Sequence, residues 1–275
     1  KLGFLKANST IQAKVIEALN NAEAIKACGI HPVEIFIGMK NFEKGGKPMD
    51  PKLKLHLDSK ENSEKDKEES TKNPEPPKEI KCPPIMNVLN KALKHSYQNL
   101  ASTGRRILIG IEISQKMDSV CLTSKNVTCL DAATFLILNL LKSEKDVTVA
   151  VFNGSKVSIV SLDKNTTIGQ AQTKLKQAKS GMVMFTPLFE WAINKKKQID
   201  IFINFFHHQW FTSIPIDCRE QEKSLNMLNT YRKRMSLPHT KLISICLSAP
   251  QVPSASLVDG SLNVLDISGF SKEVP

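Results

Sequence analysis

Three short apolar runs, separated by helical segments, constrain the fold more than any other feature of this chain. They read RILIGIEI from residue 106, IDIFINFF from residue 199 and KLISICLSA from residue 241. Each is almost continuously apolar, which is typical of a parallel strand buried on both faces. Strands that alternate with helices predict an α/β fold with a doubly wound, mostly parallel central sheet and helices on both of its faces.

The remaining elements follow from periodicity and from residues that begin or end helices. Helices are predicted over residues 130–142, 166–178, 187–195 and 217–235, and a hairpin is predicted around Gly154. A short final strand is expected in LNVLDIS. Before the sheet, one helix should end at Gly29, another should begin near Pro32, and a third should follow Pro83 and Pro84.

The chain is expected to divide into three parts. Residues 1–43 form a short all-α segment, which we interpret as the end of a helical-repeat module. Residues 44–82 are interpreted as a flexible charged linker, since they are rich in Lys, Glu and Pro and offer few side chains to a core. Residues 83–275 are assigned to the α/β domain.

The net charge, the length of the apolar runs and the cysteines indicate which partners and which compartment to expect. The formal net charge is +11 and the pI is about 9.3, which fits a partner that carries phosphate or an anionic surface, and fits equally a soluble protein with an uneven surface charge. No apolar run is long enough to span a bilayer, so no membrane association is expected. The six cysteines are scattered without a CxxC pair, and the first residues, KLGFLKANSTIQAK, do not read as a signal peptide. We therefore expect a cytoplasmic protein, with the nucleus as a further compartment.

In an open parallel sheet, ligands bind beyond the carboxyl ends of the strands. Those ends are predicted at residues 112–117, 206–210 and 248–251. The stretch GRRILIGIEISQKM resembles the first strand and loop of a von Willebrand A domain, whose pattern is Asp-x-Ser-x-Ser. Further segments, among them IHPVEIFIGMKNF, STGRR, YRKRMSLPHTKL and LDISGF, resemble in order the Ro autoantigen family of RNA-binding proteins, the TROVE family. The resemblance implies a Rossmann-like von Willebrand A domain preceded by the last helical repeats of a ring, and an RNA partner.

The metal site of the resembled family is only partly matched. Glu112 stands at the first Asp position, Ser114 at the first Ser, Lys116 at the second Ser, Met182 at the Thr and His207 at the last Asp. Thr186 lies close to the Thr position in the sequence. A lysine ammonium near the cation position opposes a divalent ion. The site is therefore expected to be degenerate, with no Mg²⁺ and no other cofactor, and with Lys116 paired to Glu112 in place of the ion.

Two other sites were weighed at the same loops. Zinc could use Glu112, His207 and His208, although adjacent residues on an extended chain point to opposite faces. A hydrolase could use Ser114, His207 and Glu112, but no nucleophile elbow surrounds Ser114. No catalytic residue is therefore assigned, and the protein is expected not to be an enzyme.

Basic stretches supply the candidate RNA contacts, which are Lys195, Lys196, Lys197, Arg232, Lys233 and Arg234. Arg105 and Arg106 form a further basic pair. Cations at helix carboxyl ends also have an ordinary structural role, so each stretch could simply be solvated. The leading hypothesis is a non-catalytic ribonucleoprotein component that binds small non-coding or misfolded RNA. The alternative is a metal-independent module that binds a protein partner through the strand-end loops and has lost RNA binding.

Overall fold

A computed structural model describes residues 10–44, 83–207, 218–248 and 263–270. The chain divides into two compact units, one formed by Lys1–Ile30 with Glu34–Ser96 and the other by His31–Val33 with Tyr97–Pro275. Of the predicted linker, residues 44–82, all but residue 44 lie outside the described residues. Among these residues no helix has the length and hydropathy needed to cross a bilayer.

The first unit is helical. Its helices are α1 (Thr10–Asn20), α2 (Ala22–Ala27), α5 (Pro83–Ser96) and α3 (Pro32–Glu43), of which the first two residues group with the second unit. The single helix expected before Gly29 is divided into α1 and α2, because the Asn21 side chain accepts a hydrogen bond from the Ala24 N–H at 3.0 Å and begins a new helix. Helix α5 packs against α1 and α2. Residues 83–96 thus group with the helices, whereas the boundary predicted at residue 83 assigned them to the sheet domain.

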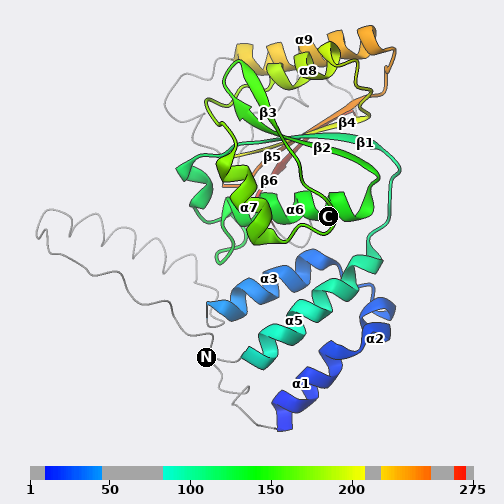
Figure 1. The fold of residues 1–275 in the computed structure, drawn as a ribbon, viewed down its shortest axis with the longest axis vertical. Coiled ribbons are helices and arrows are strands. Elements are labelled where there is room, and N and C mark those ends of the chain that lie inside the picture. The colour runs from blue at the N-terminus through cyan, green and yellow to red at the C-terminus, as the bar shows by residue number, and fades with distance from the viewer. Residues whose placement is uncertain (1–9, 45–82, 208–217, 249–262, 271–275) are drawn as a thin grey trace, which may run out of the picture. The chain divides into compact units, whose positions relative to one another are not determined.

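The second unit is built on a six-stranded sheet with strand order β3-β2-β1-β4-β5-β6 (Figure 1). The strands are β1 (Arg106–Ile111), β2 (Asp146–Asn153), β3 (Lys156–Val160), β4 (Ile201–Phe206), β5 (Lys241–Cys246) and β6 (Val264–Ser268). All neighbouring strands run parallel except β2 and β3, which form the predicted hairpin. The α/β prediction and its mostly parallel sheet are confirmed.

Helices cover both faces of this sheet (Figure 1). Helices α8 (Thr186–Asn194) and α9 (Cys218–Met235) lie on one face, and α6 (Cys129–Ser143) and α7 (Ile168–Gln177) lie on the other. Helix α7 begins with a capping box between Thr167 and Gln170, close to the predicted start. Two short 3-10 turns, η1 (Tyr97–Asn99) and η2 (Gln115–Asp118), complete the described elements and were not predicted.

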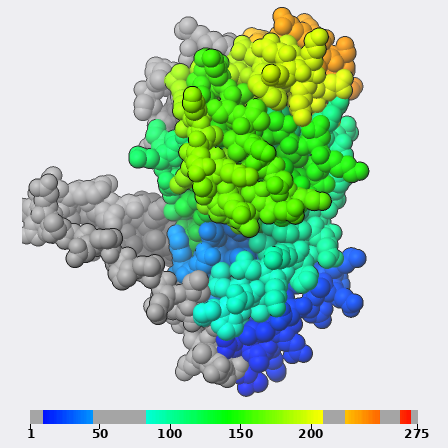
Figure 2. All heavy atoms as spheres, in the orientation of Figure 1, coloured from blue at the N-terminus to red at the C-terminus, as the bar shows by residue number. Residues whose placement is uncertain are grey.

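The core between the sheet and helices α8 and α9 is aromatic. Phe202 of β4 packs against Phe189 of α8 with the rings tilted by 48° and their centroids 4.5 Å apart, and it meets Tyr231 of α9 edge-on at 5.0 Å. Leu108 and Leu242, from the flanking strands, belong to the same buried cluster. In this way the core fixes α8 and α9 beside each other, and their surfaces adjoin in the space-filling view (Figure 2).

Candidate functional site

The strand-end loops bring together part of the predicted metal set. Glu112 follows β1 and His207 follows β4, and these strands are neighbours in the sheet. The Glu112 carboxylate is buried and accepts two hydrogen bonds of 2.7 Å, one from the Ser114 hydroxyl and one from the His207 backbone N–H. Glu112 and His207, which stand at two of the predicted metal-ligand positions, are thus joined directly by a hydrogen bond.

The proposed pairing of Lys116 with Glu112 is wrong, because no ion pair within 4.0 Å joins them in the described structure. Lys116 lies in the 3-10 turn η2 and is exposed. Burial raises the pKa of the Glu112 carboxyl, while the hydrogen bonds from His207 and Ser114 and the charge of Lys116 act in the opposite direction. Hydrogen bonds therefore take the place that we assigned to the ammonium group.

Met182 does not contribute an oxygen ligand to this site. Its side chain is 57% exposed, and its carbonyl accepts a hydrogen bond from the Gly154 N–H at 2.9 Å in the β2–β3 hairpin. Both Glu112 oxygens already accept hydrogen bonds, and Met182 offers a thioether, so these two residues fit a hard divalent cation poorly. The Thr186 hydroxyl is buried and has no hydrogen-bond partner among the described residues.

The other two strand-end hypotheses gain no support from the geometry. In the part of the chain that the structure describes, no group of three or more His, Cys, Asp and Glu side chains is arranged to hold a metal ion, and His208 lies outside that part. The Ser114 hydroxyl donates its proton to Glu112, so it is engaged as a donor to a carboxylate.

The opposite edge of the sheet, where the parallel strands begin, collects the basic stretches. Helix α8 ends just before Lys195–Lys197, α9 ends with Arg232–Arg234, and Arg105 immediately precedes β1. Lys196 and Ser236 have positive φ values of 51° and 55°, which turn the chain from each helix toward the next strand. Since β1, β4 and β5 are adjacent and parallel, these turns lie along one edge.

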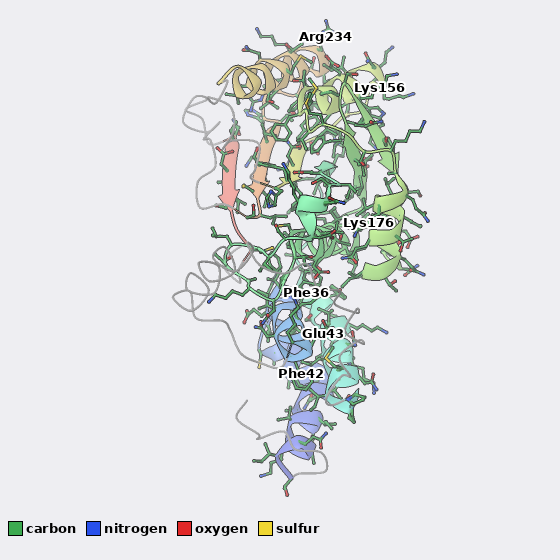
Figure 3. The ribbon with its side chains drawn as sticks, turned by 90° about the vertical axis from the view of Figure 1, so that its left-hand side faces the viewer. Phe36, Phe42, Glu43, Lys156, Lys176 and Arg234 are labelled. Carbon is green, nitrogen blue, oxygen red and sulfur yellow. The ribbon has the colours of Figure 1, made fainter. Side chains whose placement is uncertain are left out.

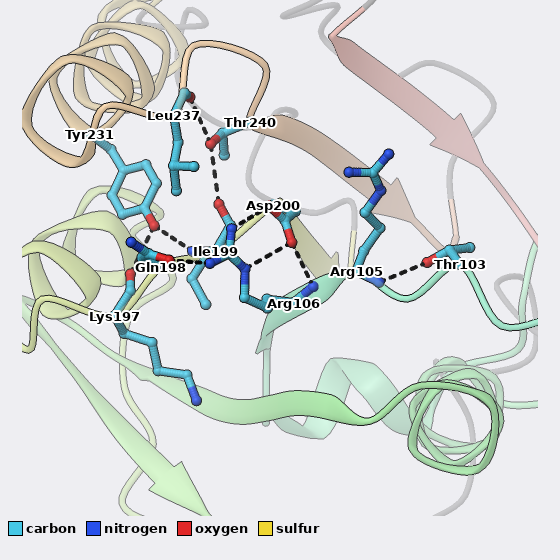
Figure 4. Close-up of polar contacts among 10 residues, drawn as sticks. All are labelled: Thr103, Arg105, Arg106, Lys197, Gln198, Ile199, Asp200, Tyr231, Leu237 and Thr240. Atoms are coloured by element: carbon cyan, nitrogen blue, oxygen red, sulfur yellow. Dashed lines mark hydrogen bonds and ion pairs between the residues drawn. The ribbon is translucent and has the colours of Figure 1, made fainter.

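A polar network holds this edge in place (Figure 4). The Tyr231 hydroxyl donates to the Lys197 carbonyl at 2.8 Å and accepts from the Ile199 N–H at 2.6 Å, which ties α9 to the start of β4. The Thr240 hydroxyl donates to the carbonyls of Ile199 at 3.1 Å and Leu237 at 3.0 Å. The turns after α8 and α9 are therefore linked by direct hydrogen bonds.

Three basic side chains near this polar network form ion pairs or hydrogen bonds within the fold. Arg106 binds Asp200 through its backbone N–H at 2.8 Å and its guanidinium at 2.7 and 2.9 Å, and that pairing lowers the pKa of Asp200. Lys197 forms an ion pair with Asp146 at 3.1 Å. The Arg232 guanidinium donates to the Thr240 carbonyl at 2.8 and 3.0 Å. Of the six predicted RNA contacts, Lys197 and Arg232 thus hold neighbouring segments of the fold.

The remaining cations form a surface that we call the basic edge, and its members are Arg105, Lys195, Lys196, Lys233, Arg234 and Lys241. All six are exposed, and among the described residues none of their charged groups has a hydrogen bond or ion pair. Arg234 projects outward from α9 in Figure 3. Lys241 was not among the candidate RNA contacts predicted from the sequence, because it is an isolated lysine. Its position as the first residue of a predicted strand could have placed it at this edge of the sheet.

Comparisons with known proteins agree with this architecture. A family model described as the Ro60 vWA domain matches residues 106–275. Among solved structures, the crystal structure of the Deinococcus radiodurans RO (RSR) protein is similar, with a TM-score of 0.73 and 18% sequence identity. That match covers 98% of this chain and 47% of the other, so this chain spans about half the length of that protein.

Proposed function

The chain belongs to the Ro60 von Willebrand A family, and we propose that it is a non-catalytic, RNA-binding component of a ribonucleoprotein. The RNA would be a small non-coding or misfolded RNA, and the compartment the cytoplasm, with the nucleus as a further one. The observation that carries the proposal is the basic edge, where exposed cations from separate parts of the chain lie at the end of the sheet where β1, β4 and β5 begin, with no hydrogen bond or ion pair to their charged groups among the described residues.

The lysine and arginine side chains of the basic edge are suited to contact phosphate groups. Lysine and arginine side chains that neutralise phosphates release counterions, so affinity falls as salt rises. These contacts position the RNA and do not read its sequence. Lys195, Lys196, Lys233 and Arg234 are the predicted contacts that remain available for this role, while Lys197 and Arg232 hold the turns from which they project.

The strand-end loops are proposed to work without a divalent cation and without catalysis. The hydrogen bonds among Glu112, Ser114 and His207 support this part of the proposal, because they satisfy the buried carboxylate without a metal. The proposed role of the Glu112 carboxylate there is structural, because its hydrogen bond from the His207 N–H joins the loop after β1 to the loop after β4.

The test is an electrophoretic mobility shift with a structured small RNA across a series of salt concentrations. We expect the chain to retard the RNA at low salt and to release it as salt rises. Replacing Lys195, Lys196, Lys233 and Arg234 by Gln should weaken binding and flatten the salt dependence by about 0.7 to 0.9 in slope for each lost contact. Absence of binding at low salt would refute the proposal.

A second candidate function, metal-independent binding of a protein partner, is favoured by exposed apolar side chains beside the strand-end loops. Leu122 is 40% exposed, and its backbone N–H donates to the carbonyl of Leu247 just after β5. Met182 is exposed next to the β2–β3 hairpin. An Asp substitution at each position should abolish partner binding under this candidate and leave RNA retardation unchanged under the first.

A further inference from the structure

A cavity of about 410 Å³ opens at the edge of the sheet where β1, β4 and β5 begin. Arg105 and Lys241 provide its basic lining, and His239 belongs to the same lining. Its apolar wall is formed by Ile201 at the start of β4 and by the turn after α9. The cavity therefore combines cations and an apolar surface within one site.

The charge of the cavity is positive because its carboxylate is already neutralised. Asp200 is the one acidic residue among those that line the described cavity, and the Arg106 guanidinium binds it through both oxygens. The guanidinium of Arg105 and the ammonium of Lys241 have no hydrogen bond or ion pair among the described residues, and Figure 4 draws no contact to the Arg105 guanidinium. Both cations are thus available to an anionic ligand.

The backbone that carries Arg105 is fixed before any ligand arrives. The buried Glu144 carboxylate accepts hydrogen bonds from the Thr103 N–H at 2.7 Å and the Gly104 N–H at 3.0 Å. The Arg105 N–H lies 3.4 Å from the Thr103 hydroxyl oxygen, to which it donates. An anchored segment lowers the entropy lost when the side chain binds a ligand.

Hydrogen bonds also hold the backbone at Lys241 in place. Its backbone N–H donates to the Asp200 carbonyl at 2.8 Å within the sheet, and the preceding Thr240 carbonyl is held by Arg232. Asp200 in turn donates its N–H to the Arg106 carbonyl at 2.8 Å. Consequently the two cations stand at the starts of β1 and β5, on either side of β4, and the sheet sets the spacing between these strands.

From this geometry we infer that the cavity takes one unpaired nucleotide of RNA, with its phosphate on Arg105 and Lys241 and its base against Leu237 and Pro238. Cavities of roughly 300 to 1,000 Å³ suit organic ligands of this size, and a bare phosphate would leave the apolar wall unused. The base must be unpaired to reach that wall, as in single-stranded RNA recognition. The inference rests on the proposed RNA binding and adds a specific subsite to it.

The experiment measures fluorescence anisotropy of a labelled single-stranded oligouridylate with the full chain over a range of salt. The test variant is Arg105→Gln with Lys241→Gln. The matched control is Lys156→Gln with Lys179→Gln, which changes the net charge equally at two exposed lysines whose ammonium groups have no contact in the described structure. Thermal melting of both variants checks that they fold.

We expect the test variant to flatten the salt dependence by about 0.7 for each lost contact, roughly 1.4 in total, and the control to retain the slope of the unmodified chain. Uridine 5′-monophosphate should also displace the oligouridylate at lower concentration than inorganic phosphate does. Equal behaviour of the two variants, or equal competition by phosphate and nucleotide, would overturn the subsite while leaving RNA binding intact. A chain that binds no oligouridylate would overturn the proposed function and the subsite together.

Discussion

Removing the Tyr231 hydroxyl should destabilise the sheet domain although the ring keeps its packing. Tyr231→Phe preserves the edge-on contact with Phe202 but deletes two hydrogen bonds, one donated to the Lys197 carbonyl and one accepted from the Ile199 N–H. Tyr231 and Ile199 are both fully buried, so water cannot readily replace these bonds.

The size of the effect follows from the group left without a partner. An unsatisfied buried donor costs about 1 to 3 kcal/mol. We therefore expect a loss of about 2 kcal/mol in the free energy of unfolding. For a domain of this size that corresponds to a decrease of roughly 4 to 8 °C in Tm. Thermal unfolding followed by circular dichroism measures it.

Tyr97 provides a matched control, since the chain contains two tyrosines and the Tyr97 hydroxyl has no hydrogen bond within the described residues. Its ring contact with the Lys142 ammonium, 5.0 Å from the centroid, does not need the hydroxyl. Tyr97→Phe should change stability by less than about 0.5 kcal/mol. If the two substitutions lowered Tm equally, the reasoning about the Tyr231 network would be refuted.

Three further predictions concern the core, alkaline pH and metal ions. Gly110→Ala should destabilise by about 1 to 3 kcal/mol, because a methyl group there would overlap the Phe152 ring; an unchanged midpoint in urea would contradict this. Burial raises the pKa of Tyr97 to about 12, above the usual tyrosine value of 10.0. Its contribution to stability is therefore complete below pH 10 and is lost as the pH rises toward 12. Tyrosinate absorbance of the Tyr231→Phe variant reports Tyr97 alone, and ionisation near pH 10 would disprove the shift. Mg²⁺ or Mn²⁺ should leave Tm unchanged, since both Glu112 oxygens accept hydrogen bonds; a clear increase in Tm would contradict the absence of a metal.

The sheet was predictable because its central strands are buried on both faces and must therefore be apolar along their whole length. The runs at β1, β4 and β5 contain few polar residues, and the segments between them carry helix-capping residues such as Thr167. The division of the first helix was less apparent. Asn21 interrupts a periodic pattern that continues past it, and only the hydrogen bond from Ala24 shows that a new helix begins.

The strand-end site was partly predictable from topology alone. Parallel neighbouring strands bring Glu112 and His207 to the same edge whatever their side chains do. The orientation of Lys116 was not predictable, because it depends on the 3-10 turn η2, which holds the lysine in an exposed position. Ser114 and a backbone N–H satisfy the carboxylate instead, and a backbone donor leaves no signal in residue identity.

The basic edge could not be predicted as a single surface. Each basic stretch was visible in the sequence, but their proximity requires β1, β4 and β5 to be neighbours, which follows from the strand order and not from any local pattern. The sequence also could not separate the structural cations from the available ones. Arg232 and Lys233 are adjacent in the chain, yet Arg232 binds the Thr240 carbonyl while Lys233 is exposed.

Photo-crosslinking of the chain to a small RNA containing 4-thiouridine, followed by peptide mass spectrometry, tests the central claim most directly. The claim is that RNA contacts the edge where the parallel strands begin. Adducts are predicted in peptides spanning residues 103–106, 195–198 and 232–241, and they should disappear as salt rises. Adducts confined to the strand-end loops around Glu112 and His207, or to helices α1, α2, α3 and α5, would contradict the account.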